Sequence, residues 1–98
     1  MIRPLALSIP ARDDLVDAAF WYETQRKGLS EDLFANIDAA LKAISERPES
    51  FPLIRKNVRR ALVKRFPFAI YFREEDDYLV VLAIMHTARS PRAWRKRI

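Results

Sequence analysis

The chain has 98 residues, half of them hydrophobic, with one glycine, one histidine and no cysteine. This length supports one domain with a single core, which we expect to span residues 1–98. The lack of cysteine excludes disulfides, a thiol nucleophile and thiolate metal ligands, and a lone histidine argues against a zinc site. We therefore expect no metal and no cofactor. The apolar stretch near the N-terminus is too short for a signal peptide or a membrane span, so we expect a cytoplasmic protein that binds no membrane.

The net charge of +5 is unevenly distributed. Residues 1–46 carry 5 Lys or Arg against 8 Asp or Glu, a balance of −3, whereas residues 47–98 carry 13 against 5, a balance of +8. This asymmetry predicts an anionic partner, either nucleic acid or an acidic protein segment. The alternative is that the arginines only keep a small sheet in solution.

The first half predicts a short strand and a first helix. Residues 2–9 alternate loosely between apolar and other side chains, which is typical of an edge strand. Pro10 suits the first position of a helix that runs to about Arg26, with Asp13 and Asp14 in its first turn. Gly28 suits the cap that ends this helix, where a positive φ is needed. One apolar stripe faces the core, and it comprises Leu15, Ala18, Ala19 and Tyr22.

A second helix follows at once. Ser30 is a suitable N-cap, and the helix should run to about Arg47, before Pro48. The linker is only a few residues long, so the two helices should form an antiparallel hairpin. Phe20 and Trp21 lie off the stripe of the first helix, and we expect them to touch a neighbouring helix. The apolar stripe of the second helix comprises Leu33, Phe34, Ile37, Ala40, Leu41 and Ile44.

The second half has the period of strands. Residues 48–52 should form a loop that carries Phe51 inward, and three strands should follow at residues 58–64, 68–73 and 78–86, separated by turns at 65–67 and 74–77. The last turn suggests a register that pairs Arg73 with Tyr78, Tyr71 with Val80 and Ala69 with Leu82. A slip of one residue would exchange the two faces of the sheet.

With this register, the two faces of the sheet differ. The face under the helices should be apolar throughout, and it comprises Phe68, Ile70, Phe72, Leu79, Val81, Ala83 and Met85. The opposite face is mixed, and Val80, Leu82 and Ile84 would expose a patch in its middle that monomers seldom tolerate. We expect this patch to be covered, either by the region of Trp94 folding back or by a segment of a partner.

Four phrases of the sequence carry a resemblance. In order they are AAFWYETQRKGLSEDL, RPESFP, VRRALVKRFPFAIYFR and VVLAIMHTARSPRAW, and together they cover nearly the whole chain. With the order of elements above, the chain resembles the ParE/RelE superfamily of type II toxin–antitoxin toxins, most closely the ParE-like plasmid-stabilisation branch. The resemblance implies an α+β fold with an N-terminal strand and an antiparallel helical hairpin that packs on one face of a twisted antiparallel sheet. The chain departs from such sequences at Ile9, where serine is common, so we expect the usual cap of the first helix to be lost.

The resemblance also implies a bacterial growth inhibitor in complex with a small cognate antitoxin, whose C-terminal segment wraps the toxin. Two activities divide the superfamily. RelE-like members are metal-independent endoribonucleases that cleave mRNA on the ribosome, whereas ParE-like members inhibit DNA gyrase. We favour gyrase inhibition because no compact acid–base set emerges from the sequence. An inactive homologue that only binds an antitoxin is a third alternative.

Metal-free cleavage of RNA needs proton transfer and cations that hold the phosphorane charge. The candidate catalytic residues for a nuclease are His86, Tyr71, Arg60 and Arg89. Histidine is the side chain best suited to proton transfer near neutral pH, yet a lone histidine is often only a hydrogen-bonded structural group. Candidate contacts to a partner or to nucleic acid are Arg60, Lys64, Arg65, Arg73, Arg89, Arg92 and Trp94.

Each of these contacts has a structural alternative. Arg59, Arg60, Lys64 and Arg65 alternate about a strand, so only two of the four can share a face. Trp94 is suited to stacking on RNA, but it is equally suited to packing over Val80 and Leu82.

Overall fold

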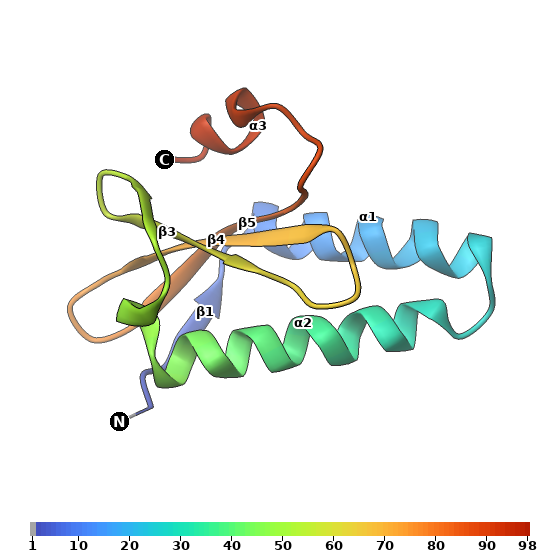
Figure 1. Ribbon diagram of the computed structural model, residues 1–98, viewed down its shortest axis with the longest axis horizontal. Helices are drawn as coiled ribbons and strands as arrows, with labels where there is room; N and C mark the ends of the chain where they lie inside the picture. The colour runs from blue at the N-terminus through green and yellow to red at the C-terminus, as the bar shows by residue number, and fades with distance from the viewer. Residues whose placement is uncertain (1) are drawn as a thin grey trace.

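The structure is a computed structural model that describes residues 2–98. Two long helices form an antiparallel hairpin on one side of a five-stranded sheet, and a short helix lies on the other side (Figure 1). The elements are β1 (Leu5–Leu7), α1 (Ile9–Gln25), α2 (Leu29–Glu46), the 3₁₀ helix η1 (Pro48–Ser50), β2 (Leu53–Arg55), β3 (Val58–Leu62), β4 (Phe68–Glu74), β5 (Leu79–His86) and α3 (Pro91–Arg95).

The sheet confirms the predicted α+β architecture, with one difference in strand direction. Its strand order is β1-β5-β4-β3-β2. Strands β3 to β5 pair antiparallel as predicted, and β2 adds a further antiparallel strand, but β1 runs parallel to β5, so the sheet is mixed. The sequence analysis also missed β2, which has only three residues between Pro52 and the positive φ of 48° at Lys56. A segment this short is unable to display the alternation that marks a strand.

Helix α1 begins one residue earlier than predicted and keeps a serine cap. Ser8 precedes the helix, and its Oγ accepts a hydrogen bond from Ala11 N–H at 3.2 Å. The expectation that Ile9 removes the cap is therefore wrong, because the capping serine lies one position upstream. Because the helix starts earlier, Asp13 and Asp14 lie after its first turn. The first turn itself contains no acidic residue.

The turn of the hairpin depends on Gly28 and Glu23. Gly28 has the predicted positive φ, 89°, but it caps α2, and Arg26 ends α1. Ser30 is not the N-cap because it already lies in the first turn of α2. The Glu23 carboxylate accepts hydrogen bonds from Gly28 N–H at 2.9 Å, from Ser30 N–H at 3.0 Å and from Ser30 Oγ at 2.7 Å. An acidic side chain from α1 thus satisfies amides at the start of α2 that the helix leaves unpaired.

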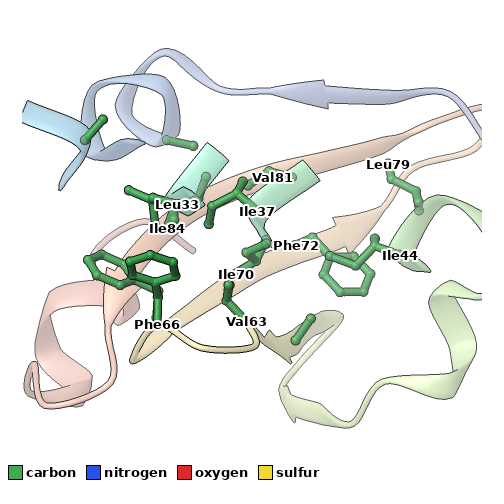
Figure 2. Packing of buried hydrophobic residues seen from close by; sticks show 14 residues of the cluster. Leu33, Ile37, Ile44, Val63, Phe66, Ile70, Phe72, Leu79, Val81 and Ile84 are labelled. Carbon is green, nitrogen blue, oxygen red and sulfur yellow. The ribbon is translucent and has the colours of Figure 1, made fainter. Parts of the chain in front are cut away.

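The main core lies between the hairpin and the sheet (Figure 2). The predicted stripes of both helices face it except for Phe34, which is 44% exposed, and Phe51 points inward, with its ring 5.9 Å from that of Phe72 in an edge-to-face contact. The prediction for Phe20 and Trp21 is wrong, because their side chains are 74% and 56% exposed. The largest fully buried residues of this core are Leu33, Ile37, Ile44, Ile70, Phe72, Leu79, Val81 and Ile84.

The predicted register between β4 and β5 is wrong, and a bulge explains part of the error. Arg73 pairs with Val80 rather than Tyr78, and the register shifts by one residue between Tyr71 and Phe72. Because of this extra residue in β5, Ala83 and Met85 pack on the face away from the hairpin, whereas Ile84 faces the main core. The predicted faces of β4, and those of Leu79 and Val81, are confirmed.

The C-terminal segment of the chain covers the face of the sheet that points away from the hairpin, which we call the second face. Trp94 of α3 stacks on the ring of Tyr71, with 5.2 Å between the ring centroids and 19° between the planes. Ala93 and Ile98 also pack against the hydrophobic cluster of this face, which includes Leu82. Of the two covers that the sequence analysis left open, the C-terminal segment is the one present in the structure.

Candidate functional site

The four candidate catalytic residues separate into two pairs on opposite faces of the sheet. His86 lies beside the main core, where its ring makes an edge-to-face contact with Phe68 at 5.6 Å. Tyr71 lies in the cluster under α3, and Arg60 is directly opposite it on β3, so both belong to the second face. His86 and Arg89 form the other pair, since both line one groove and the Arg89 N–H donates to the His86 carbonyl at 3.0 Å.

His86 and Arg89 line an open groove beside α1. The groove has a volume of about 460 Å³ and is walled by Trp21 and Phe68, with Asp14 and Asp17 on the α1 side. The His86 Nδ1 accepts a hydrogen bond from Ala88 N–H at 3.0 Å, which in a neutral ring leaves the proton on Nε2. Within residues 2–98, the ring has no hydrogen bond to a carboxylate that would orient it as a general base.

Tyr71 is poorly placed for proton transfer. Its side chain is 4% exposed and lies beneath the indole of Trp94. The main role of Tyr71 and Trp94 in this structure is therefore to close the second face. The sequence analysis considered this packing role for Trp94, and the structure confirms that Trp94 packs over this face.

The remaining basic candidates are dispersed. Arg60 lies on the second face, while Lys64 and Arg65 lie in the turn after β3, and Lys64 borders a small pocket against α2. Arg73 is held by Glu75, with Nε 2.6 Å from the Glu75 carboxylate. Arg92 is exposed on α3. The neighbour of Arg60, Arg59, faces the other way and bonds to Phe51 O and Glu74, which confirms that these arginines do not all share one face.

The sequence analysis missed a polar junction at the bulge of β5. Asp14 Oδ2 accepts a hydrogen bond from Ile84 N–H at 2.9 Å and from Arg97 Nη1 at 2.5 Å, and Asp14 Oδ1 accepts from Arg97 Nη2 at 3.0 Å. Arg97 Nη1 and Ser8 Oγ also donate to Leu82 O, at 3.3 and 3.4 Å. No sequence signal links Asp14 with Arg97, because the two are separated by 83 positions.

This junction favours the charged form of Arg97. Its hydrogen bonds to Asp14 raise the pKa of Arg97 above its ordinary value; burial lowers it, and the charges of Asp14 and Asp13 raise it further. The bidentate pair joins the C-terminal segment to α1 around the part of β5 that extends beyond β1. The partial burial of both side chains makes this the most enclosed ion pair of the described residues.

Large apolar side chains are exposed on the hairpin. Five of them come from α1 and α2, and we call them together the hairpin surface: Ile9, Val16, Phe20, Trp21 and Phe34.

Among residues 2–98 there is no group of His, Asp and Glu side chains that could hold a metal ion. No helix in this part of the chain is long and apolar enough to cross a membrane.

Comparison with known proteins agrees with the fold and the sequence resemblance. The family model for the ParE toxin of type II toxin–antitoxin system, parDE, matches residues 5–91. The proteins named Toxin ParE2 from two Mycobacterium tuberculosis strains, H37Rv and CDC 1551 / Oshkosh, are each 27% identical to this chain over 94 residues, which is 95% of this chain and 90% of the relative.

A solved structure has the same fold. It is titled "Chromosomal ParDE TA system from P. aeruginosa" and matches with a TM-score of 0.77 at 19% identity, over 87% of this chain and 96% of that one. At this identity the likeness supports the fold, and the match of the family model over most of the chain supports the family. The chain belongs to the ParE toxin family of type II toxin–antitoxin systems.

Proposed function

We propose that this protein inhibits growth by acting on DNA gyrase in the cytoplasm, and that a cognate antitoxin neutralises it in a hetero-oligomeric complex. The observation that carries the choice of target is the separation of His86 and Arg89 from Tyr71 and Arg60 by the sheet. A general acid and base that act on one phosphodiester must both reach it within hydrogen-bond distance. An inhibitor that acts by binding has no such requirement.

The hairpin surface is where we propose that the antitoxin binds. Its five side chains leave apolar area in water that a partner would cover, and such exposed patches mark protein interfaces. The second face has no comparable area because the C-terminal segment already covers it. The solved ParDE structure matches 87% of this chain, which supports a partner of the ParD type.

The deciding experiment compares two readouts for the same purified chain. We expect it to block supercoiling of relaxed plasmid by gyrase, to leave message intact on translating ribosomes, and to lose its effect when the antitoxin is added. Cleaved message with normal supercoiling would replace gyrase inhibition with a ribonuclease. Normal growth on expression of folded protein, with neither effect, would favour the inactive homologue.

Two variants test the mechanism within the same assays. His86→Ala and Tyr71→Phe each remove a group that could transfer a proton, and both should retain full inhibition of supercoiling. Tyr71→Phe is the milder change because it keeps the ring that Trp94 stacks on. If either variant abolishes growth arrest while its melting temperature is unchanged, its side chain takes part in the activity, and message cleaved by the original chain but not by the variant would contradict inhibition by binding alone.

A further inference from the structure

The positive charge of the chain is concentrated in two segments that contain no acid. Residues 53–73 contain 7 Lys or Arg and residues 79–98 contain 5, and neither segment contains Asp or Glu. The four acids at positions 74–77 form the turn between them. Glu74 and Glu75 are partly neutralised by ion pairs with Arg3, Arg59 and Arg73.

The fold brings unpaired cations from these segments to one side of the sheet. Figure 1 shows that the β2–β3 turn and α3 both project from the side of the sheet that faces away from α2. The register places Arg60 on this side as well, between the two projections. We call the set the basic face, and its members are Arg55, Lys56, Arg60, Arg92, Arg95 and Lys96. Within residues 2–98 none of these six side chains forms an ion pair, although the Arg95 guanidinium lies 5.5 Å from the centre of the Trp94 ring.

The part of the basic face formed by α3 lacks the apolar anchors of a typical protein interface. Hot spots of protein complexes are buried aromatic and apolar side chains, with arginine beside them. Leu53 of β2 and Leu62 of β3 are exposed, but none of the large exposed hydrophobic residues of the described chain lies in α3, β4 or β5, since Trp94, Ala93 and Ile98 are turned inward onto the sheet. Interfaces with nucleic acid, by contrast, are polar and strongly positive. The chemistry of this face therefore matches a row of phosphates better than an acidic protein segment.

The stacked aromatic rings further restrict the kind of nucleic acid. Proteins that bind single strands present exposed aromatic rings on which unpaired bases stack. Here Trp94 is stacked on Tyr71 and flanked by Arg95, and Tyr71 is buried, so neither ring has a free face for a base. A duplex requires no such platform because it offers its backbone, which exposed Lys and Arg contact without reading sequence.

We propose that the basic face binds the phosphate backbone of a nucleic-acid duplex, without sequence preference. This binding is separate from inhibition of gyrase, so it can be tested with no enzyme present. The contacts are electrostatic, and each phosphate that is neutralised releases condensed counterions. Affinity should therefore fall steeply with salt.

The test measures the binding of the full chain to labelled duplexes by fluorescence anisotropy over a range of salt of roughly 50 to 200 mM. The triple variant Arg92→Gln, Arg95→Gln and Lys96→Gln should weaken binding by roughly tenfold to a hundredfold and reduce the slope of log affinity against log salt by about 3. Arg60→Gln, a separate variant on β3, should reduce the slope by about 1. Arg12→Gln, Lys27→Gln and Lys42→Gln together make the same change in net charge on the exposed side of the hairpin, and this control should bind as the original chain does.

Further binding measurements in the same experiment identify the ligand. Duplex DNA and duplex RNA of equal length distinguish two sources of the same phosphate chemistry, and binding of either supports the proposal. Three results would overturn it: no binding to any duplex, tighter binding to the single strand, or equal weakening in the control variant. Displacement of the duplex by an acidic peptide at an equal concentration of charge would instead assign the face to a protein partner.

Discussion

The hairpin surface and the basic face lie on opposite sides of one sheet and differ in almost every respect. The hairpin, residues 9–46, carries 4 Lys or Arg against 8 Asp or Glu and exposes five large apolar side chains. The basic face carries six unpaired cations over a cluster whose apolar side chains are covered by the chain itself. The two binding functions that we propose therefore differ in driving force, which is burial of apolar area on the hairpin surface and charge on the basic face.

The two sides also differ in how they contribute to stability, and the largest expected effect lies under the hairpin. Phe72 of β4 has no exposed surface, and its ring contacts that of Phe51 edge to face. Phe72→Ala should lower the free energy of unfolding by about 3–5 kcal/mol, because it removes a buried ring and leaves a cavity. Urea denaturation followed by circular dichroism measures this change. A loss below about 1 kcal/mol would mean that the main core does not dominate stability.

Trp94→Ala makes the corresponding change on the second face, and we expect a smaller loss. The indole is only half-buried, so removal of its stacking on Tyr71 and of its buried area should cost about 2 kcal/mol. The newly exposed cluster should also bind an apolar dye, as an uncovered hydrophobic surface does. Trp94→Phe is the matched control, and it should retain most of the stability. A loss as large as that of Phe72→Ala would remove the distinction between the two layers.

The ion pair of Asp14 with Arg97 joins α1 to the C-terminal segment. Its removal should lower the free energy of unfolding by less than Phe72→Ala does. Arg97→Gln should cost about 1–3 kcal/mol, because it leaves the partly buried Asp14 carboxylate without its charged donor. A double-mutant cycle with Asp14→Asn isolates the pairwise energy. A coupling energy near zero would show that the C-terminal segment is held by the packing of Trp94, Ala93 and Ile98 rather than by this ion pair.

The smallest effect should come from Glu23, and it should depend on pH. Hydrogen bonds from Gly28 N–H and from the Ser30 hydroxyl and N–H lower the pKa of Glu23 below its ordinary value of 4.5. A lowered folded-state pKa contributes stability above pH 4.5, and this contribution is lost as the pH falls through the folded-state value. Glu23→Gln should therefore melt at a lower temperature than the original chain at pH 7, and the difference should shrink in acid. A difference that persists unchanged at pH 3 would assign the effect to the shape of the side chain rather than to its charge.

The sequence predicted the parts of the fold that repeat with a clear period. The stripes of both helices, the sheet strands from β3 to β5 and the inward position of Phe51 follow from such patterns and from local turn residues. The register of β5 does not, because nearly every residue from Leu79 to Met85 is apolar and no alternation specifies a face. The side chains of Asp14 and Ser8 recognise Ile84 N–H and Leu82 O at the bulge, and these contacts are visible only in three dimensions.

The site residues were harder to predict for the same reason. His86 and Arg89 are close in sequence and are together in the groove. Tyr71 was a candidate by residue type, and the sheet places it on the other face, under Trp94. Residue type alone is unable to assign a face when a bulge interrupts the strand.

The position of α3 in the chain has a consequence for folding during synthesis. The ribosome makes the hairpin and the whole sheet before it makes the residues that cover the second face, because α3 and Arg97 follow β5 in the chain. A chain that is released before α3 is complete would therefore fold with Tyr71, Leu82 and Met85 exposed to other chains. Self-association through this transient surface should be strongest for chains interrupted between residues 87 and 93, and should cease once the final turn of helix is in place.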